Sequence, residues 1–344
     1  MTGHPSVSVV ILNWNGVNYL KEFLPSVCAS SYPNLDIIVG DNASTDGSVE
    51  FLAENYPQVM VIVNEQNYGF AGGYNKVLDQ IESDYFVLLN SDVEVPPDWV
   101  EPVIKLMESD SLIAAAQPKI LSCKDKTMFE YAGAAGGFID IFGYPFCRGR
   151  IFDTIEKDQR QYDISSEVFW ASGAALFIKR AKWLEVEGLD GDFFAHMEEI
   201  DLCWRLKNKG YKIMYCAESK VYHLGGGTLS AESPFKTYLN FRNNLVLLQK
   251  NLPFLQAVLT IFVRFWLDFL ALIRFLLDGK IENAKSISKA HFYFFSHVFS
   301  NAKKARIIDK LKFNAAGTYK RSIVWQYFVL KRKAFSSLQK AFQR

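Results

Sequence analysis

The chain has 344 residues, 49% hydrophobic and 22% charged, which is ordinary for a globular protein with one large domain, or one domain and an appendage. Its net charge of +1 hides an asymmetry: acidic residues outnumber basic ones 33 to 20 in residues 1–249, and basic ones outnumber acidic ones 18 to 4 in residues 250–344. Five cysteines without a CxxC pair argue for reduced thiols in the cytosol, and the N-terminus shows no signal-peptide pattern. The charge split predicts two functional regions, the basic one facing an anionic surface.

The first 90 residues alternate between short apolar runs and segments with helical spacing. The spacing predicts helices over 19–30, 48–54 and 74–81, and strands over 7–12, 36–40, 59–63 and 85–89. This alternation predicts a parallel, doubly wound sheet with right-handed crossovers. The polar loops that follow these strands are expected at one edge of the sheet.

Further along the chain, the pattern predicts helices over 99–108 and 199–209, strand character over 112–120, 167–178 and 212–223, and a long apolar helix over 254–277. Residues 121–165 are predicted to be rich in loops, which suits a surface that faces an acceptor.

The run Phe86–Leu89 leads directly into Asn90, Ser91 and Asp92. These polar residues are expected at the C-terminal end of a buried strand, where open α/β sheets bind ligands. An acidic group there suits a divalent cation that carries a diphosphate, because Mg²⁺ and Mn²⁺ prefer oxygen ligands. The alternative is that Asp92 only terminates the strand.

Two further loops have the composition of a nucleotide site. Asp41 and Asn42 follow a strand, where a carboxylate can accept a hydrogen bond from a base or a ribose, although the same residues also form simple Asx-turns. Gly69, Gly72 and Gly73 would allow the backbone to approach a nucleotide closely. Their spacing is neither GxGxxG nor a P-loop.

A cluster of carboxylates forms the second strong signal. Glu198 and Glu199 are expected at a helix start, where they can act as a general base with a raised pKa or merely satisfy the helix dipole. Asp201 and Arg205 are four residues apart, which predicts an ion pair. His223 is expected at a strand exit, before the glycines 225–227, where its neutral imidazole would join Asp92 as a metal ligand.

Taken together, these segments resemble glycosyltransferase family 2, an inverting family with the GT-A fold, and most closely its rhamnosyltransferase-like branch. The matching segments appear in the order of the family and cover roughly residues 6–250: 9–16, 41–48, 67–75, 89–92 and 198–202. The resemblance implies an α/β fold with a mostly parallel doubly wound sheet. It also implies a nucleoside-diphosphate sugar as donor and metal assistance by Mg²⁺ or Mn²⁺.

The resemblance also assigns roles to individual positions. Asp41 would contact the base of a UDP- or dTDP-sugar; Glu199 would be the catalytic base, with Glu198 second; Asp92 would hold the metal, with His223 joining it. One departure is that Asn90 stands in place of the first carboxylate of the family's Asp-x-Asp. The remaining residues expected to bind the donor are Asn13, Asn42, Asn67, Gly69, Gly72, Asn75, Asn90 and Ser91.

The C-terminal region, residues 251–344, is rich in basic and apolar residues, and this composition predicts a role other than catalysis. Residues 254–277 are long enough to span a bilayer, but Arg264, Asp268 and Arg274 are costly in hydrocarbon, which favours peripheral binding to an anionic membrane on its cytoplasmic face. No nucleic-acid-binding motif is present. The alternative is a helical appendage that packs on the catalytic domain or forms a homodimer. The expected division is a catalytic domain over 1–250 and a basic helical region over 251–344.

The prediction is therefore an inverting transferase that moves a sugar, with rhamnose as a candidate, to a lipid-linked or polysaccharide acceptor in cell-surface glycan synthesis. Two other functions compete with it. One is an assembly partner that binds nucleotide sugar without turnover, against which the glutamate pair argues. The other is a nucleotidyltransferase, although residues 13–16 contain no basic residue for a triphosphate.

Overall fold

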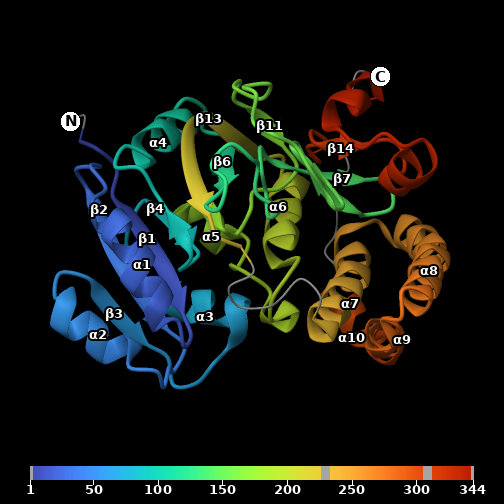
Figure 1. Ribbon diagram of the computed structural model, residues 1–344, viewed down its shortest axis with the longest axis horizontal. Helices are drawn as coiled ribbons and strands as arrows, with labels where there is room; N and C mark the ends of the chain where they lie inside the picture. Colours follow the sequence, from blue (N-terminus) through green and yellow to red (C-terminus); the bar gives the residue numbers. More distant parts are fainter. Residues whose placement is uncertain (1–2, 226–232, 305–311, 342–344) are drawn as a thin grey trace.

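The computed structural model describes residues 3–225, 233–304 and 312–341, which form a large mixed sheet between helices, a small second sheet and a C-terminal group of helices (Figure 1). The large sheet consists of nine strands: β1 (Val7–Asn13), β2 (Leu35–Asp41), β3 (Met60–Val63), β4 (Tyr85–Leu89), β5 (Val93–Glu94), β6 (Ile113–Ser122), β11 (Ser166–Val168), β12 (Ala175–Lys179) and β13 (Lys212–His223).

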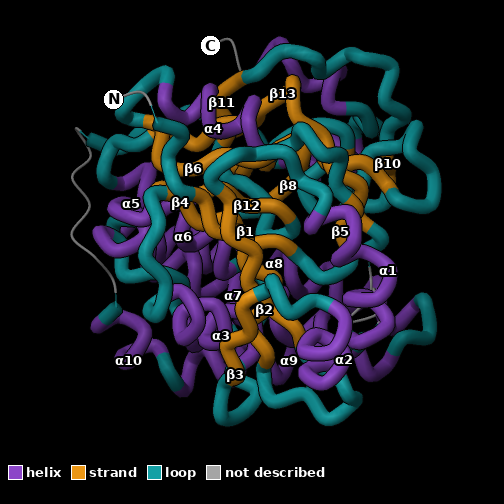
Figure 2. The backbone as a smooth tube through the Cα atoms, turned by 90° about the vertical axis from the view of Figure 1, so that its left-hand side faces the viewer, coloured by secondary structure: helices purple, strands orange, loops and turns teal. Residues whose placement is uncertain are grey.

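The strand order of the large sheet is β11-β13-β6-β12-β4-β1-β2-β3, with β5 paired to β13. The N-terminal half, from β4 through β1 and β2 to β3, is parallel, as predicted. In the other half, β12 runs antiparallel to both β4 and β6, while β13 and β6 are parallel, so the sheet as a whole is mixed. Figure 2 shows β3, β2 and β1 at one end of this twisted sheet.

Helices cover both faces of the sheet because its central strands are apolar on both sides. In β1, Val7, Val9 and Ile11 pack with α1 and α4, whereas Val10 packs with α3 on the opposite face. Burial of strands on both faces is typical of parallel α/β sheets. The helices that enclose this sheet are α1 (Val17–Cys28), α2 (Ser48–Asn55), α3 (Gly69–Leu78), α4 (Val100–Glu108), α5 (Arg180–Glu185) and α6 (Glu198–Asn208).

Three local predictions need correction. Helix α3 begins at Gly69, so the glycine-rich segment is itself the first turn of the helix rather than a turn before it. The expected strand character over 167–178 is divided between β11 and β12, which lie at different places in the sheet, because residues 169–174 carry the chain between them. Residues 121–165 contain four short strands.

Those four strands build the second sheet together with a strand from the tail. The order is β10-β9-β8-β7-β14, and β14 runs parallel to β7. The C-terminal segment therefore packs on the domain that carries the large sheet, and the boundary expected at residue 250 stays a prediction. The strands of this sheet are β7 (Gly137–Asp140), β8 (Pro145–Cys147), β9 (Arg150–Ile151), β10 (Thr154–Ile155) and β14 (Thr318–Tyr319).

The C-terminal helices are α7 (Pro234–Asn251), α8 (Phe254–Leu277), α9 (Ile281–Ser296) and α10 (Val298–Lys303), followed by short helical turns at Trp325–Val329 and Phe335–Ala341. They lie together at one side of the molecule (Figure 1). The predicted bounds of α8 are confirmed. It is the one described helix that is long and apolar enough to cross a membrane, and little of its most apolar stretch is buried.

Two of the three charged residues of α8 point into the protein. Arg264 and Asp268 are 2% and 0% exposed, and Nη2 of Arg264 lies 3.2 Å from Oδ1 of Asp268. His291 of α9 lies 3.1 Å from the other carboxylate oxygen. The guanidinium of Arg264 also stacks 3.7 Å from the centre of the Tyr144 ring. The polar side of α8 is thus satisfied by protein, and its apolar side faces outward.

Candidate active site

Asp92 and His223 meet at the edge of the large sheet. Strand β5 begins just after Asp92, and its pairing with the end of β13 sets His223 opposite Val93. Nε2 of His223 lies 3.1 Å from Oδ1 of Asp92 and 3.3 Å from the side-chain amide of Asn90. Ser91, which lies between Asn90 and Asp92 in the sequence, is partly exposed. The structure therefore brings the predicted metal-site residues together.

Glu130 is a further member of this cluster, which the sequence did not reveal. Its Oε2 atom lies 3.1 Å from Nδ1 of His223, so the imidazole sits between two carboxylates. Burial lowers the pKa of His223, but the hydrogen bonds and charges of Asp92 and Glu130 outweigh it and raise the pKa to about 10. Without a metal the ring is therefore protonated, and the prediction of a neutral imidazole that binds a metal stays a prediction. A metal ligand must give up that proton.

This donor set suits a metal shared with a substrate. Asp92 supplies a carboxylate oxygen and His223 an imidazole nitrogen, and these two atoms lie 3.1 Å apart. No group of three or more His, Cys, Asp or Glu side chains within the described part of the chain could hold a metal alone. Two protein ligands fit a divalent ion whose other ligands are phosphate oxygens and water.

The predicted nucleotide loops lie at the neighbouring strand ends. Asn13 and Asp41 are opposite each other in the β1–β2 register, and the Asn13 amide donates to Oδ2 of Asp41 at 2.9 Å. The backbone N–H of Ser44 donates to the other carboxylate oxygen at 2.7 Å. Oδ1 of Asn13 is buried and has no hydrogen-bond partner among the described residues. That unsatisfied acceptor is available to a ligand.

A second amide network holds the start of α3. The side chain of Asn42 donates to the carbonyl oxygen of Gly69 at 3.0 Å, and Asn67 accepts from the Gly69 N–H at 2.8 Å. Gly69 has a φ of +70°, and a Cβ there would lie 2.5 Å from the Phe194 ring. Only glycine fits this close approach. Gly72, one turn into the helix, abuts Tyr68.

The side chain of Asn75 binds another loop of the protein. Its amide donates to the Leu189 carbonyl at 2.7 Å and accepts from the Leu189 N–H at 3.0 Å. These two bonds tie α3 to the loop before the glutamate pair. The expected part of Asn75 in donor binding stays a prediction.

Glu198 and Glu199 begin α6, as predicted, and face the nucleotide loops. A Cβ at Gly173 would lie 3.9 Å from the Cβ of Glu199 and 3.2 Å from the Phe70 ring, so the start of α6 faces the first turn of α3. One carboxylate oxygen of each glutamate is buried without a hydrogen-bond partner in the described chain. Glu198 is only 4% exposed, whereas Glu199 is partly exposed.

Burial of these carboxylates changes their acidity. Desolvation raises the pKa of Glu199 to about 7. Desolvation, followed by the charge of Glu199, raises the pKa of Glu198 well above its usual value. A pKa near neutrality is the property that a general base requires. Asp201, by contrast, is fully buried and paired with Arg205 at 2.8 Å, which confirms the predicted ion pair.

The loop before α6 is held by α7, a helix that the sequence did not reveal. Phe194, His196 and Met197 have φ values of 63°, 69° and 74°, which are costly for residues other than glycine. The Asn243 amide donates to the carbonyl oxygens of Phe193, Ala195 and His196 at 3.0, 2.9 and 2.7 Å.

Arg242 adds two further bonds of the same kind, to the carbonyls of Asp192 and Phe193, each at 2.9 Å. The one signal in the sequence for this role is the polar triplet 242–244, an unusual choice for the middle of an otherwise buried helix. Of the glycines predicted to follow His223, residues 226 and 227 lie outside the described residues.

A mixed α/β sheet with nucleotide-type loops, an Asn-x-Asp turn and a helix-start glutamate pair at one edge defines a GT-A glycosyltransferase. Residues 8–173 match the model of glycosyl transferase family 2. This match covers just under half of the chain, and with the fold and the relatives below it supports a nucleotide-sugar glycosyltransferase similar to that family.

The chain is similar to an N-acetylglucosaminyl-diphospho-decaprenol L-rhamnosyltransferase of Mycobacterium tuberculosis, with 24% identity over 62% of this chain and 75% of the relative. Among solved structures, it resembles GalNAc-T7 with UDP, GalNAc and Mn²⁺ (TM-score 0.55, 17% identity, 73% of this chain and 48% of that one). It also resembles S. aureus TarS 1-349 with UDP-GlcNAc (TM-score 0.54, 15% identity, 83% and 79%). This chain thus spans about half the length of the GalNAc-T7 chain. At these identities the structures support the fold.

Proposed function

We propose that the protein is an inverting glycosyltransferase that moves a sugar from a UDP- or dTDP-sugar to a lipid-linked acceptor in the synthesis of a cell-surface glycan. The observation that carries the proposal is that Asp92 and His223 meet at the sheet edge where the nucleotide loops end, while Glu199 lies opposite the first turn of α3. The mycobacterial relative, whose name gives a diphospho-decaprenol acceptor and a rhamnosyl donor, supports the acceptor class and makes rhamnose the first sugar to test.

In the proposed reaction, Glu199 accepts the proton of an acceptor hydroxyl. The hydroxyl oxygen then attacks the anomeric carbon of the donor, and the bond to the diphosphate breaks with its electron pair on the diphosphate oxygen. Attack from the face opposite the leaving group inverts the anomeric centre. Glu198 stays buried behind Glu199, and its own raised pKa keeps a second negative charge away from the base.

The donor would lie along the sheet edge. Asp41, oriented by Asn13, is proposed to contact the base, and Asn42, Asn67, Gly69 and Gly72 to shape the pocket. At the diphosphate end, Asp92 and His223 would hold Mg²⁺ or Mn²⁺, with Asn90 and Ser91 beside them. The ion supplies positive charge that stabilises the leaving diphosphate. The Mn²⁺ named in the GalNAc-T7 structure supports this assignment.

The experiment is a transfer assay with the purified full chain, dTDP-rhamnose and other sugar nucleotides, and N-acetylglucosaminyl diphospholipid, with Mn²⁺, Mg²⁺ or EDTA. We expect metal-dependent formation of a glycosylated lipid with inverted anomeric configuration. Donor binding without transfer to any acceptor would favour the non-catalytic alternative. Release of pyrophosphate from a nucleoside triphosphate would favour the nucleotidyltransferase.

We further propose that the protein lies on the cytoplasmic face of an anionic membrane, with α8 in the plane of the interface. Because Arg264 and Asp268 are satisfied within the protein, spanning would require the C-terminal helices to come apart. A large apolar surface stays exposed, which in soluble proteins marks an interaction site. Its α8 members include Phe254, Leu255, Leu259, Phe262, Trp266, Phe269, Leu270 and Leu277.

Basic side chains border this apolar surface. The Arg274 guanidinium lies 5.3 Å from the centre of the Phe328 ring, which brings the end of α8 next to Trp325–Val329 and the exposed residues 331–333, Lys-Arg-Lys. This combination suits anionic headgroups. All five cysteines are free thiols, which is compatible with a cytosolic location.

Vesicle flotation with anionic and neutral phospholipid tests the membrane proposal. Trp266→Glu should release the protein from both kinds of vesicle, and the triple change of residues 331–333 to Gln should release it from anionic vesicles selectively. A stable dimer in solution that loses its association with Trp266→Glu, and no binding to vesicles, would instead identify a homodimer interface.

A further inference from the structure

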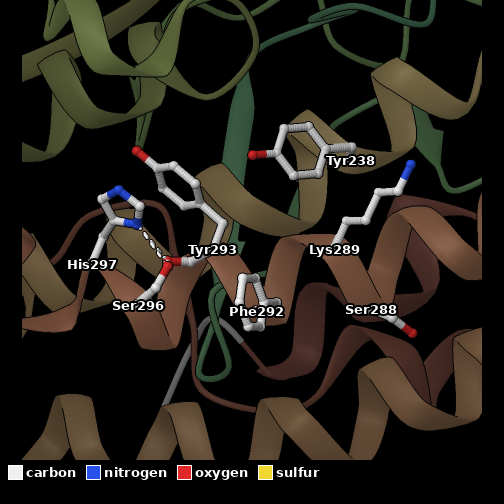
Figure 3. A pocket seen from close by; sticks show the side chains of 7 residues that line it. All are labelled: Tyr238, Ser288, Lys289, Phe292, Tyr293, Ser296 and His297. Carbon is white, nitrogen blue, oxygen red and sulfur yellow. Dashed lines mark hydrogen bonds between the residues drawn. The ribbon is translucent and has the colours of Figure 1, made fainter.

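A groove lies between α7 and α9, outside the site described above. It has a volume of about 530 Å³. Figure 3 shows the rings of Tyr238 from α7 and of Phe292 and Tyr293 from α9 around it. Tyr293 stacks on His297 with 4.0 Å between ring centres and meets Tyr238 edge-on at 6.5 Å. Its remaining lining residues are Ser288, Lys289 and Ser296.

The rings of this groove continue toward the catalytic loop. Tyr238 packs 6.3 Å from Phe235, one turn earlier on α7, and Phe235 packs 6.2 Å from Phe194. Phe194 lies four residues before Glu198, and its carbonyl oxygen accepts from the Phe70 N–H at 2.8 Å. An apolar path therefore leads from the start of α6 to the groove.

A half-buried cation stands at the catalytic end of this path. Lys236 lies in the first turn of α7 and makes no hydrogen bond or ion pair with the described residues. The positive charge of Lys236 contributes to lowering the pKa of His196. The charge of Glu130 acts to raise the pKa of Lys236, and the charge of Arg150 acts to lower it. Burial lowers the pKa of Lys236. A desolvated ammonium without a partner is complementary to an anionic group such as a phosphate.

The other end of the groove opens toward the exposed apolar surface. Phe292 is 77% exposed, and Phe295, on the same helix, is 60% exposed and stacks on Phe265 of α8 at 4.9 Å. A hydrophobic chain that leaves the interface beside α8 and α9 would thus meet Phe292 first and Tyr238 further in. Its polar head would then lie near Lys236.

We propose that the groove between α7 and α9 binds the hydrocarbon chain of a diphospholipid acceptor, with Lys236 beside the acceptor's diphosphate and the sugar hydroxyl at Glu199. This inference rests on the proposed function, because it presumes a lipid-linked acceptor. It adds where each part of the acceptor would lie. The sugar would lie at the start of α6, the diphosphate at the first turn of α7, and the hydrocarbon chain between α7 and α9.

The test compares two acceptors that carry the same N-acetylglucosaminyl diphosphate on a decaprenyl chain or on a two-isoprene chain. For Phe292→Ser and Tyr238→Ser, we expect the preference in kcat/KM for the long chain to fall roughly tenfold, through KM, because each change removes most of an aromatic surface that the bound chain would cover. Transfer to the short chain should hardly change. Phe299→Ser, an 85% exposed phenylalanine on α10 outside the groove, is the matched control and should keep the preference.

The diphosphate contact is tested separately. Lys236→Met should raise KM roughly tenfold for both diphosphate acceptors but not for an alkyl N-acetylglucosaminide without phosphate, and Lys236→Arg should restore most of the affinity. Lys105→Met, which changes an exposed lysine on α4 outside the groove and the catalytic site, is the control.

The two proposals fail in different ways. Two results would overturn the proposed groove and leave the proposed function intact. In the first, the groove variants transfer sugar and keep the wild-type preference for the long-chain acceptor. In the second, Phe299→Ser loses as much of that preference as the groove variants do. Absence of transfer to diphospholipid of either length, with transfer to another class of acceptor, would overturn the proposed function and the groove together. Crosslinking of a photoreactive prenyl diphosphate to residues 288–297 in the wild-type chain would support the groove directly.

Discussion

Nε2 of His223 lies 3.1 Å from Oδ1 of Asp92 although 131 residues separate them in the chain. The contact exists because β13 passes β5 in antiparallel register, with His223 opposite Val93. Strand pairing of this kind fixes both side chains at the edge where the nucleotide loops end. Asp92 is therefore the first residue whose substitution would test the proposed metal site.

Replacement of Asp92 by Asn should lower the rate of transfer by about 10²–10³, because it removes the carboxylate that would hold the ion at the leaving group. The measurement is kcat over a range of Mn²⁺ concentrations. Asp79→Asn, an exposed carboxylate at the end of α3, should have no effect. Full activity of Asp92→Asn at low Mn²⁺ would remove Asp92 from the proposed metal site.

The rate of transfer should depend on the ionisation of Glu199. Only the carboxylate can accept a proton, and burial raises its pKa to about 7, so kcat should rise with pH through about 7 and then level off. Glu199→Gln should lower kcat by about 10²–10⁴ and leave donor affinity unchanged, as measured by calorimetry. If Glu199→Gln kept the wild-type rate and pH profile, a residue other than Glu199 would be the catalytic base.

The same pKa shift has a consequence for stability. The folded-state pKa of Glu199 lies above the unfolded value of 4.5, so the folded state binds the proton more tightly. This contribution to stability is complete below pH 4.5 and is lost as pH rises through about 7. Between pH 4 and 8 the wild type should therefore lose roughly 3 kcal/mol more than Glu199→Gln, measured by urea unfolding. An equal change in the free energy of unfolding of both proteins would contradict the raised pKa of Glu199.

Asn243→Ala should destabilise the protein by about 2–4 kcal/mol, because it removes the side-chain donor of the Ala195 and His196 carbonyl groups and one donor of the Phe193 carbonyl, which keeps its bond from Arg242. It should also lower kcat more than it raises the KM for the donor, since the loop positions Glu199 rather than the nucleotide. Asn240→Ala is the control, because Asn240 lies on the same helix and makes no side-chain hydrogen bond with the described residues. Equal unfolding midpoints for the two variants would argue against the loop contacts.

The buried ion pair of α8 should show a strongly non-additive response. Arg264→Met alone should cost about 3–5 kcal/mol, because Asp268 stays buried with the His291 ring and the Tyr144 hydroxyl beside it but without its guanidinium partner. The double variant Arg264→Met/Asp268→Leu should recover most of that loss, since no unpaired charge is left. Chemical denaturation of the three proteins measures the coupling. A single variant as stable as the wild type would mean that α8 is not held by its polar side.

Local patterns were sufficient where an element depends on its own residues. The apolar run 85–89 forms β4, and the helical spacing over 254–277 forms α8, each with the predicted bounds. The polar ends of β1, β2 and β4 lie together because parallel strands present their C-terminal ends at one edge. The four-residue spacing of Asp201 and Arg205 was enough to predict their ion pair.

Long-range packing decided the rest. The segment 167–178 reads as one apolar stretch, yet its two strands pair with different partners, because β12 enters between β4 and β6. Glu130 carries no local signal, and Asn243 shows only the polar triplet 242–244, since each acquires its role from a partner 93 or about 50 residues away. The orientation of Arg264 and Asp268 likewise depends on contacts with other elements.

The sequence by itself determined the α/β alternation and the residue types of the site, and it indicated the resemblance to the family, because these depend on periodicity and on motifs within single loops. Only the tertiary structure decided that His223 is bracketed by two carboxylates, that α7 holds the loop before Glu198, and that α8 turns its charges inward and its apolar side outward. The physical reason is that pKa values, burial and helix orientation depend on the neighbours that distant segments bring to a residue.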